Sequence, residues 1–174
     1  MEKISERLSW IRELVKAEEQ MEDTGMVDMS TGLDPRKSLQ QETLKMLQEL
    51  KNQFIDSATA FNELKTSALG RIKIYGIAKT VSDFMLFRNG YKMIFSLKEP
   101  GIISIRFNFI GPQYIPSQIP TASSSATQAM MEEILLEAKM GAFGELQWTY
   151  QGHLVKTENI VKYNMTMFVK ESTK

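Results

Sequence analysis

The chain has 174 residues, a formal net charge of +0 and no cysteine, and a single domain of this length buries roughly 70% of the surface that its unfolded form exposes. The lack of cysteine excludes a disulfide framework, a thiol nucleophile and any cysteine-ligated metal or iron–sulfur site. Charges recur throughout the first twenty residues, with no signal-peptide core, and no apolar span is long enough to cross a membrane, so a cytoplasmic location is expected.

Residues 3–20 are predicted to form an amphipathic helix, because apolar side chains recur every three or four positions and charged ones occupy the other face. The apolar set is Ile4, Leu8, Trp10, Ile11, Leu14 and Val15. Residues 21–34 are rich in Gly, Asp, Ser, Thr and Met, a composition typical of a mobile linker. We therefore expect a helix and linker over 1–34, followed by a single α+β domain over 35–174.

A long helix is predicted over 35–69. Asp34 and Pro35 form a helix-start signal, and Leu47, Phe54 and Phe61 repeat every seven residues. Such a helix is about 50 Å long, whereas ordinary strands span roughly 17–20 Å. We therefore expect its N-terminal half to pack either on the first helix as a hairpin or on a second copy of the chain.

Strands are predicted within 71–110, where the sequence FMLFRNGYKMIFSLKEPG over 84–101 places Asn89-Gly90 between two apolar runs. This dipeptide is typical of a two-residue hairpin turn. The turn pairs Arg88 with Tyr91, and the same register places one set of side chains on one face, namely Phe84, Leu86, Met93 and Phe95.

The other face of this hairpin is also apolar, and it carries Met85, Phe87 and Ile94 together with Lys92. A hairpin with two apolar faces is either covered on both sides or exposed to a partner on one of them. Whichever set the helices leave bare is the predicted partner-binding surface. On the following strand, 102–110, the face with Ser104 and Arg106 is expected to be wet.

A proline-rich crossover is predicted over 111–125, because three prolines spaced four residues apart favour extended backbone. Its apolar residues are Tyr114, Ile115 and Ile119. A loop of this length either carries the chain past the edge of the sheet or faces a partner or ligand.

A helix is predicted over 127–140, introduced by Ser125 and Gln128 as a capping box and closed by Gly141. Two strands are predicted within 145–170, at 145–151 and 160–169, where apolar residues alternate. The expected fold is α+β: a mainly antiparallel sheet of about six strands with helices on one face, preceded by an N-terminal helical pair, in the order α-α-β-β-β-β-α-β-β. This order resembles that of small secretion-chaperone domains, and the resemblance implies dimerisation and the holding of partner segments on a sheet surface.

No catalytic, cofactor-binding or metal site is predicted. The strings Asp23-Thr-Gly and Tyr75-x-x-x-Lys79 match short pieces of enzyme motifs but lack the surrounding elements that those enzymes need, and His153 is the one histidine. Basic residues do cluster in the central strands, but in the predicted register they do not share one face, so nucleic acid is not an expected partner. They are Arg71, Lys73, Arg88, Lys92 and Arg106.

The sequence thus favours a non-enzymatic cytoplasmic protein-interaction module, of an adaptor, chaperone-like or regulatory kind, that binds a protein partner and forms a homodimer. The alternative is an α+β domain with an apolar pocket for a small hydrophobic ligand, or an enzyme without a recognisable motif. The 12 methionines suit an adaptable binding surface as well as a core.

Overall fold

Residues 6–26, 35–109 and 133–173 are described by a computed structural model of the chain. The chain divides into two units, Met1–Leu39 and Gln40–Lys174, and the boundary lies near the start of the helix α2 (Pro35–Leu64). The first unit contains a short 3₁₀ helix, η1 (Glu6–Leu8), and the helix α1 (Ser9–Thr24), which ends where Gly25 adopts the left-handed conformation. No side chain of α1 is buried.

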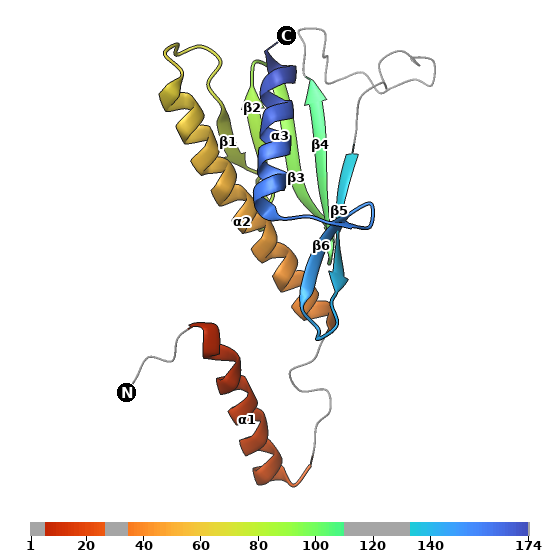
Figure 1. Ribbon diagram of the computed structural model, residues 1–174. Coiled ribbons are helices and arrows are strands. Elements are labelled where there is room, and N and C mark those ends of the chain that lie inside the picture. The colour runs from red at the N-terminus through yellow and green to blue at the C-terminus, as the bar shows by residue number, and fades with distance from the viewer. Residues whose placement is uncertain (1–5, 27–34, 110–132, 174) are drawn as a thin grey trace. The chain divides into compact units, whose positions relative to one another are not determined.

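The second unit is an antiparallel sheet with two helices (Figure 1). Each strand pairs with its sequence neighbours, in the order β1 to β7. The elements are α2 (Pro35–Leu64), β1 (Lys73–Gly76), β2 (Phe84–Arg88), β3 (Tyr91–Glu99), β4 (Ile102–Phe109), β5 (Glu133–Met140), β6 (Leu146–Tyr150), β7 (His153–Leu154) and α3 (Thr157–Ser172). The predicted fold class, a mixed α+β protein built on an antiparallel sheet, is confirmed.

The predicted hairpin is present with its predicted register. Phe84 pairs with Phe95, and Arg88 pairs with Tyr91. Asn89 and Gly90 have φ angles of 51° and 83°. Two successive positive φ angles define a type I′ turn, whose twist matches that of the flanking strands. Asn-Gly is the dipeptide that adopts this turn most readily.

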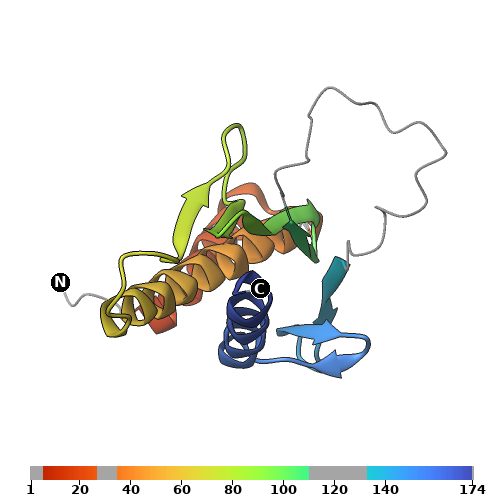
Figure 2. The same ribbon diagram turned by 90° about the horizontal axis from the view of Figure 1, so that it is seen from above.

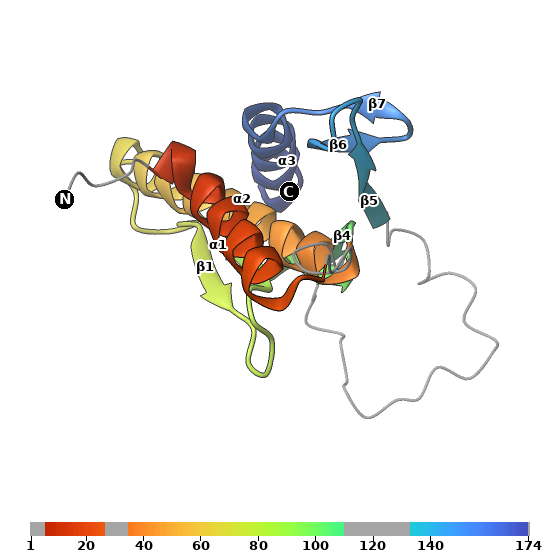
Figure 3. The ribbon, with the colours of Figure 1, turned by 90° about the horizontal axis from the view of Figure 1, so that it is seen from below.

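The sheet curves around α3, and both α2 and α3 lie on its concave side, as views along the strands show (Figures 2 and 3). Side chains of both helices and of the concave face form one apolar core. At its centre the Phe54 ring of α2 lies 4.7 Å from the Phe95 ring and 6.0 Å from the Phe84 ring. The alternate residues of each strand therefore point to the convex face.

The sheet covers more of the long helix than expected. Residues Thr43 to Ala58 of α2 bury a continuous stripe against the core, and packing of the N-terminal half on the first helix or on a second copy stays a prediction. The helix crosses the strands obliquely (Figure 1) and is fixed near both ends. Thr43 Oγ1 accepts a hydrogen bond of 2.8 Å from the Gly101 amide, and the Asn62 side chain bonds both backbone groups of Ile72.

Two local assignments in the C-terminal part are wrong. Residues 133–140 of the helix predicted over 127–140 form the strand β5, and residues 127–132 lie outside the described residues. The segment predicted as a strand over 160–169 belongs to the helix α3. β5 forms because the free edge of β4 supplies its hydrogen-bonding partners, from Ile102 opposite Glu137 to Arg106 opposite Glu133. In α3 the buried residues are spaced by three or four positions, at Ile160, Val161, Asn164, Phe168 and Ser172.

In the part of the chain that the structure describes, no helix has the length and apolar character needed to cross a membrane.

Candidate protein-binding surface

The convex face of the sheet carries an apolar row that neither α2 nor α3 covers. Tyr75 on β1 pairs with Met85 on β2, which pairs with Ile94 on β3. Phe87 lies two residues from Met85 on the same face. Tyr75 is 43% exposed, and the other three side chains are partly exposed. These four residues are called the convex apolar patch below.

Three cationic side chains border this patch. Lys73 and Lys92 are the two cross-strand neighbours of Phe87, and Arg106 is the neighbour of Ile94. Lys73, Lys92 and Arg106 therefore share the convex face, whereas Arg88 lies on the concave face, so the five basic residues of the central strands do not all share one face. The grouping of these three could not be read from the sequence, because it depends on the register of β1 and β4 against the hairpin. The three are called the basic rim.

An acidic side chain lies beyond the rim, on β5. Glu133 Oε1 accepts a hydrogen bond of 2.6 Å from Ser104 Oγ and lies 3.3 Å from Lys98 Nζ. The bond from Ser104, together with the nearby charges of Lys98 and Arg106, holds the pKa of Glu133 below its ordinary value. Ser104 is buried beneath this contact, so the expectation that the face of β4 is wet holds for Arg106 and not for Ser104.

The structure separates the two residue sets proposed for partner binding. Phe84, Leu86, Met93 and Phe95 have no exposed surface, so they belong to the core and cannot contact a partner. Met85, Phe87 and Ile94 remain partly exposed on the convex face. The third predicted group, Tyr114, Ile115 and Ile119, lies outside the described residues.

The role of Arg88 was not predicted from the sequence; this residue lies on the concave face at the end of β2. Its side chain is 4% exposed, and burial lowers the pKa of its guanidinium. Nε donates to the Gly70 carbonyl at 2.6 Å, and Nη1 donates to the Val169 carbonyl and the Ser172 hydroxyl at the end of α3. The guanidinium lies 5.4 Å from the centre of the Phe61 ring.

Arg88 is therefore a structural tie between the loop after α2, the hairpin and the C-terminus of α3. A cation at this position satisfies terminal carbonyls and complements the negative end of the helix dipole. Asn89 reinforces it, since its side chain donates to the Ser172 carbonyl at 2.9 Å. The turn Asn89-Gly90 was recognisable from sequence, but the arginine's partners at the end of α3 are more than eighty residues away.

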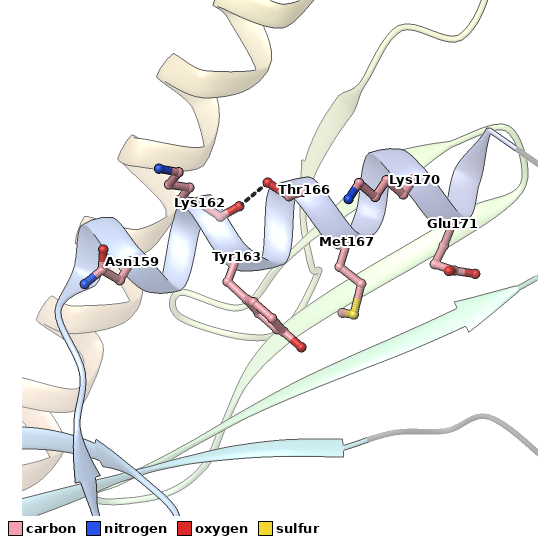
Figure 4. Close-up of a pocket in the computed structure, with 7 residues that line it drawn as sticks. All are labelled: Asn159, Lys162, Tyr163, Thr166, Met167, Lys170 and Glu171. Carbon is pink, nitrogen blue, oxygen red and sulfur yellow. Dashed lines mark hydrogen bonds between the residues drawn. The ribbon is translucent and has the colours of Figure 1, made fainter.

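Surface hollows occur on the helical side of the sheet. One of about 470 Å³ runs along α3 (Figure 4). Tyr163 and Met167 point the same way into it, while the Thr166 hydroxyl donates to the Lys162 carbonyl at 2.6 Å. All of its described lining residues come from α3, so within the described part of the chain it has no opposite wall.

A second hollow, of about 570 Å³, lies between α2, β6 and the segment that joins β7 to α3, and includes Met46, Trp148 and Val155. Within the described residues no three His, Cys, Asp or Glu side chains are grouped so that they could hold a metal ion.

Comparisons with known proteins found no matching family model, no similar curated protein and no similar solved structure.

Proposed function

We propose that this protein is a non-enzymatic interaction module that acts in the cytoplasm, self-associates, and holds a segment of a protein partner on the convex apolar patch. The observation that carries the proposal is the row of Tyr75, Met85 and Ile94 on a sheet face that α2 and α3 leave uncovered. A single exposed apolar side chain is ordinary, whereas a contiguous apolar row across three strands is typical of a binding surface.

The basic rim indicates the chemistry of the partner segment. Lys73, Lys92 and Arg106 border the patch, so a segment that combines apolar side chains with acidic ones is favoured over a basic one. Such a segment would cover the apolar row and place its carboxylates beside the three cations.

Single-stranded nucleic acid is the less favoured occupant. Tyr75 and Phe87 are aromatic and could stack on bases, but Met85 and Ile94, the other two residues of the patch, are not aromatic. The acidic Glu133 and Glu137 also lie on the convex face, as their pairing with Arg106 and Ile102 shows. Phosphate-binding surfaces are usually more uniformly positive than this.

The proposal can be tested with two synthetic amphipathic peptides of fifteen residues, identical in their Leu and Phe positions and carrying either Glu or Lys at the others. The full-length chain is expected to bind the Glu peptide at least about tenfold more tightly at low salt. Hydrogen exchange should show new protection in β1, β2 and β3. Equal affinity for both peptides, or protection confined to α2 and α3, would contradict the proposal.

Matched variants sharpen this test. Ile94→Glu should weaken binding of the Glu peptide by about tenfold or more, because it removes apolar surface and adds a like charge. Tyr163→Glu introduces the same charge at a 62% exposed apolar residue of α3 and should leave binding unchanged. Poly-dT provides the test for nucleic acid. If this oligonucleotide binds with a steep salt dependence and displaces the Glu peptide, the occupant of the patch is nucleic acid and not a protein segment.

A further inference from the structure

The helix α1 exposes an apolar face along its whole length. Trp10 and Leu14 are 59% and 60% exposed, Val15 is also exposed, as is Leu8 at the end of the adjoining η1, and no residue of α1 is buried. Helices of this kind are stable when another surface covers the apolar stripe. The identity of that surface can be inferred from the residues that occupy the stripe.

The centre of the stripe follows a heptad pattern. Positions spaced alternately by four and three residues are Ile11, Leu14, Glu18 and Met21 in α1, continued by Arg7 in the adjoining η1, which is the spacing of the two core positions of a coiled coil. Two of these five residues are charged, and their charges are opposite. Charged residues at core positions lower stability unless a partner compensates them, and they can then specify the alignment of the helices.

The two charged positions distinguish the possible pairings of two α1 helices. In a parallel pair, Arg7 faces the second Arg7 and Glu18 faces the second Glu18, so both contacts are repulsive. In an antiparallel pair centred between Arg12 and Glu13, Arg7 of each copy faces Glu18 of the other, which gives two attractive contacts. Ile11 then faces Leu14, again twice because the arrangement is symmetric.

The residues that flank the stripe agree with the antiparallel arrangement. Leu8 comes to lie beside Val15 of the second copy, and the large Trp10 lies beside the small Ala17. The remaining charges also agree, since residues 17–24 contain four acidic and no basic side chains whereas residues 6–16 contain three basic and two acidic ones. The acidic end of each helix therefore lies beside the positive end of the other helix dipole.

We propose that α1 pairs with α1 of a second copy of the chain as an antiparallel two-helix coiled coil. The proposal rests on the self-association part of the proposed function and is independent of the convex apolar patch. An anionic membrane surface is a poor alternative occupant, because helices that bind such surfaces carry mainly Lys and Arg on their polar face, whereas acidic residues outnumber basic ones in α1.

The sharpest test is charge reversal with mixing, in the full-length chain. The unmodified protein is expected to show a mass approaching twice 19.9 kDa in analytical ultracentrifugation at tens of micromolar or above. Arg7→Glu and Glu18→Arg should each weaken the dimer by about tenfold or more, because each makes both cross-helix contacts repulsive. An equal mixture of the two variants should dimerise again, since both contacts become attractive, and so should the double variant.

Glu13→Arg is the matched control, because it makes the same charge change as Glu18→Arg on the polar face of α1 and should leave the dimer in place. A monomeric unmodified protein would remove self-association altogether. A dimer that withstands both single reversals would keep self-association and overturn the pairing through α1. Variants that stay monomeric on mixing would overturn the antiparallel arrangement.

Cross-linking gives an independent reading of orientation. The chain has no cysteine of its own, so only introduced thiols react with a short bis-maleimide. A mixture of Leu8→Cys and Val15→Cys chains should cross-link more than either variant alone. Stronger cross-linking of each variant with itself would indicate a parallel pair. Binding of the monomeric protein to phosphatidylserine vesicles through α1 would make a membrane surface the occupant instead.

Discussion

Replacing Arg88 with alanine is expected to lower the free energy of unfolding by about 3 kcal/mol. The guanidinium is 4% exposed and donates to the Gly70 carbonyl, the Val169 carbonyl and the hydroxyls of Ser172 and Thr173. Bonds from a charged donor contribute roughly 1.5–3 kcal/mol each, and the favourable position at the end of α3 adds about 1 kcal/mol.

The loss is smaller than the sum of these contributions for two reasons. The Val169 carbonyl keeps other donors, because the hydroxyls of Ser172 and Thr173 also bond it, at 3.3 and 2.6 Å. Removing the guanidinium also removes the cost of burying a charge. About 3 kcal/mol corresponds to a fall of roughly 10 °C in the melting temperature for a domain of this size.

Thermal and urea unfolding of the full-length chain would measure this change, and hydrogen exchange would locate it at the end of α3. Arg88→Lys should lose about half as much, because one ammonium keeps the charge but cannot reach both Gly70 and α3. The neighbouring Arg71, exposed in the structure, provides the control, and Arg71→Ala should change stability by less than about 0.5 kcal/mol. If Arg88→Ala lowers the free energy of unfolding by less than about 1 kcal/mol and leaves hydrogen exchange in α3 unchanged, Arg88 does not link the hairpin to this helix in the way argued.

Phe54→Ala should lower the free energy of unfolding by about 3–5 kcal/mol in urea denaturation, because the ring is fully buried against Phe84 and Phe95. Ile55→Ala, at a 40% exposed position, should lower it far less. Equal losses for the two variants would contradict the orientation of α2 against the sheet. Ser104→Ala should raise the pKa of Glu133 toward its ordinary value in a carbon-detected NMR titration, since the Ser104 bond is the largest cause of its depression. Because the pKa of Glu133 is depressed, its contact with Ser104 stabilises the fold above the ordinary carboxylate pKa, and this stabilisation is lost as the pH falls through the depressed value. The unmodified chain should therefore lose more stability on acidification than the Ser104→Ala variant does.

The sequence by itself determined the central hairpin. Asn89-Gly90 admits two positive φ angles at little cost, and the turn length then sets every cross-strand pair from Arg88 opposite Tyr91 to Phe84 opposite Phe95. The two apolar faces of the hairpin followed from this register alone. Local chemistry sufficed because all of the interacting residues lie within a dozen positions of one another.

Only the tertiary structure decided which hairpin face is buried. Both faces are apolar, so hydrophobic pattern could not choose between Phe84 with Phe95 and Met85 with Ile94. The choice depends on where α2 and α3 pack, and it leaves the second pair as the candidate binding surface. The basic rim likewise required the pairing of β1 and β4 with the hairpin.

Tertiary structure also decided between helix and strand in the C-terminal part. Residues 133–140 contain a run of apolar residues that fits either period, and the open edge of β4 supplies hydrogen-bond partners that make them a strand. Residues 160–169 alternate in hydrophobicity, yet a stripe from Ile160 to Phe168 fits the concave face only as a helix. In α1, by contrast, the heptad positions and their opposite charges are set by the sequence. Where a pattern fits two structures equally well, the deciding free energy comes from partners distant in sequence, and those exist only once the rest of the sheet has formed.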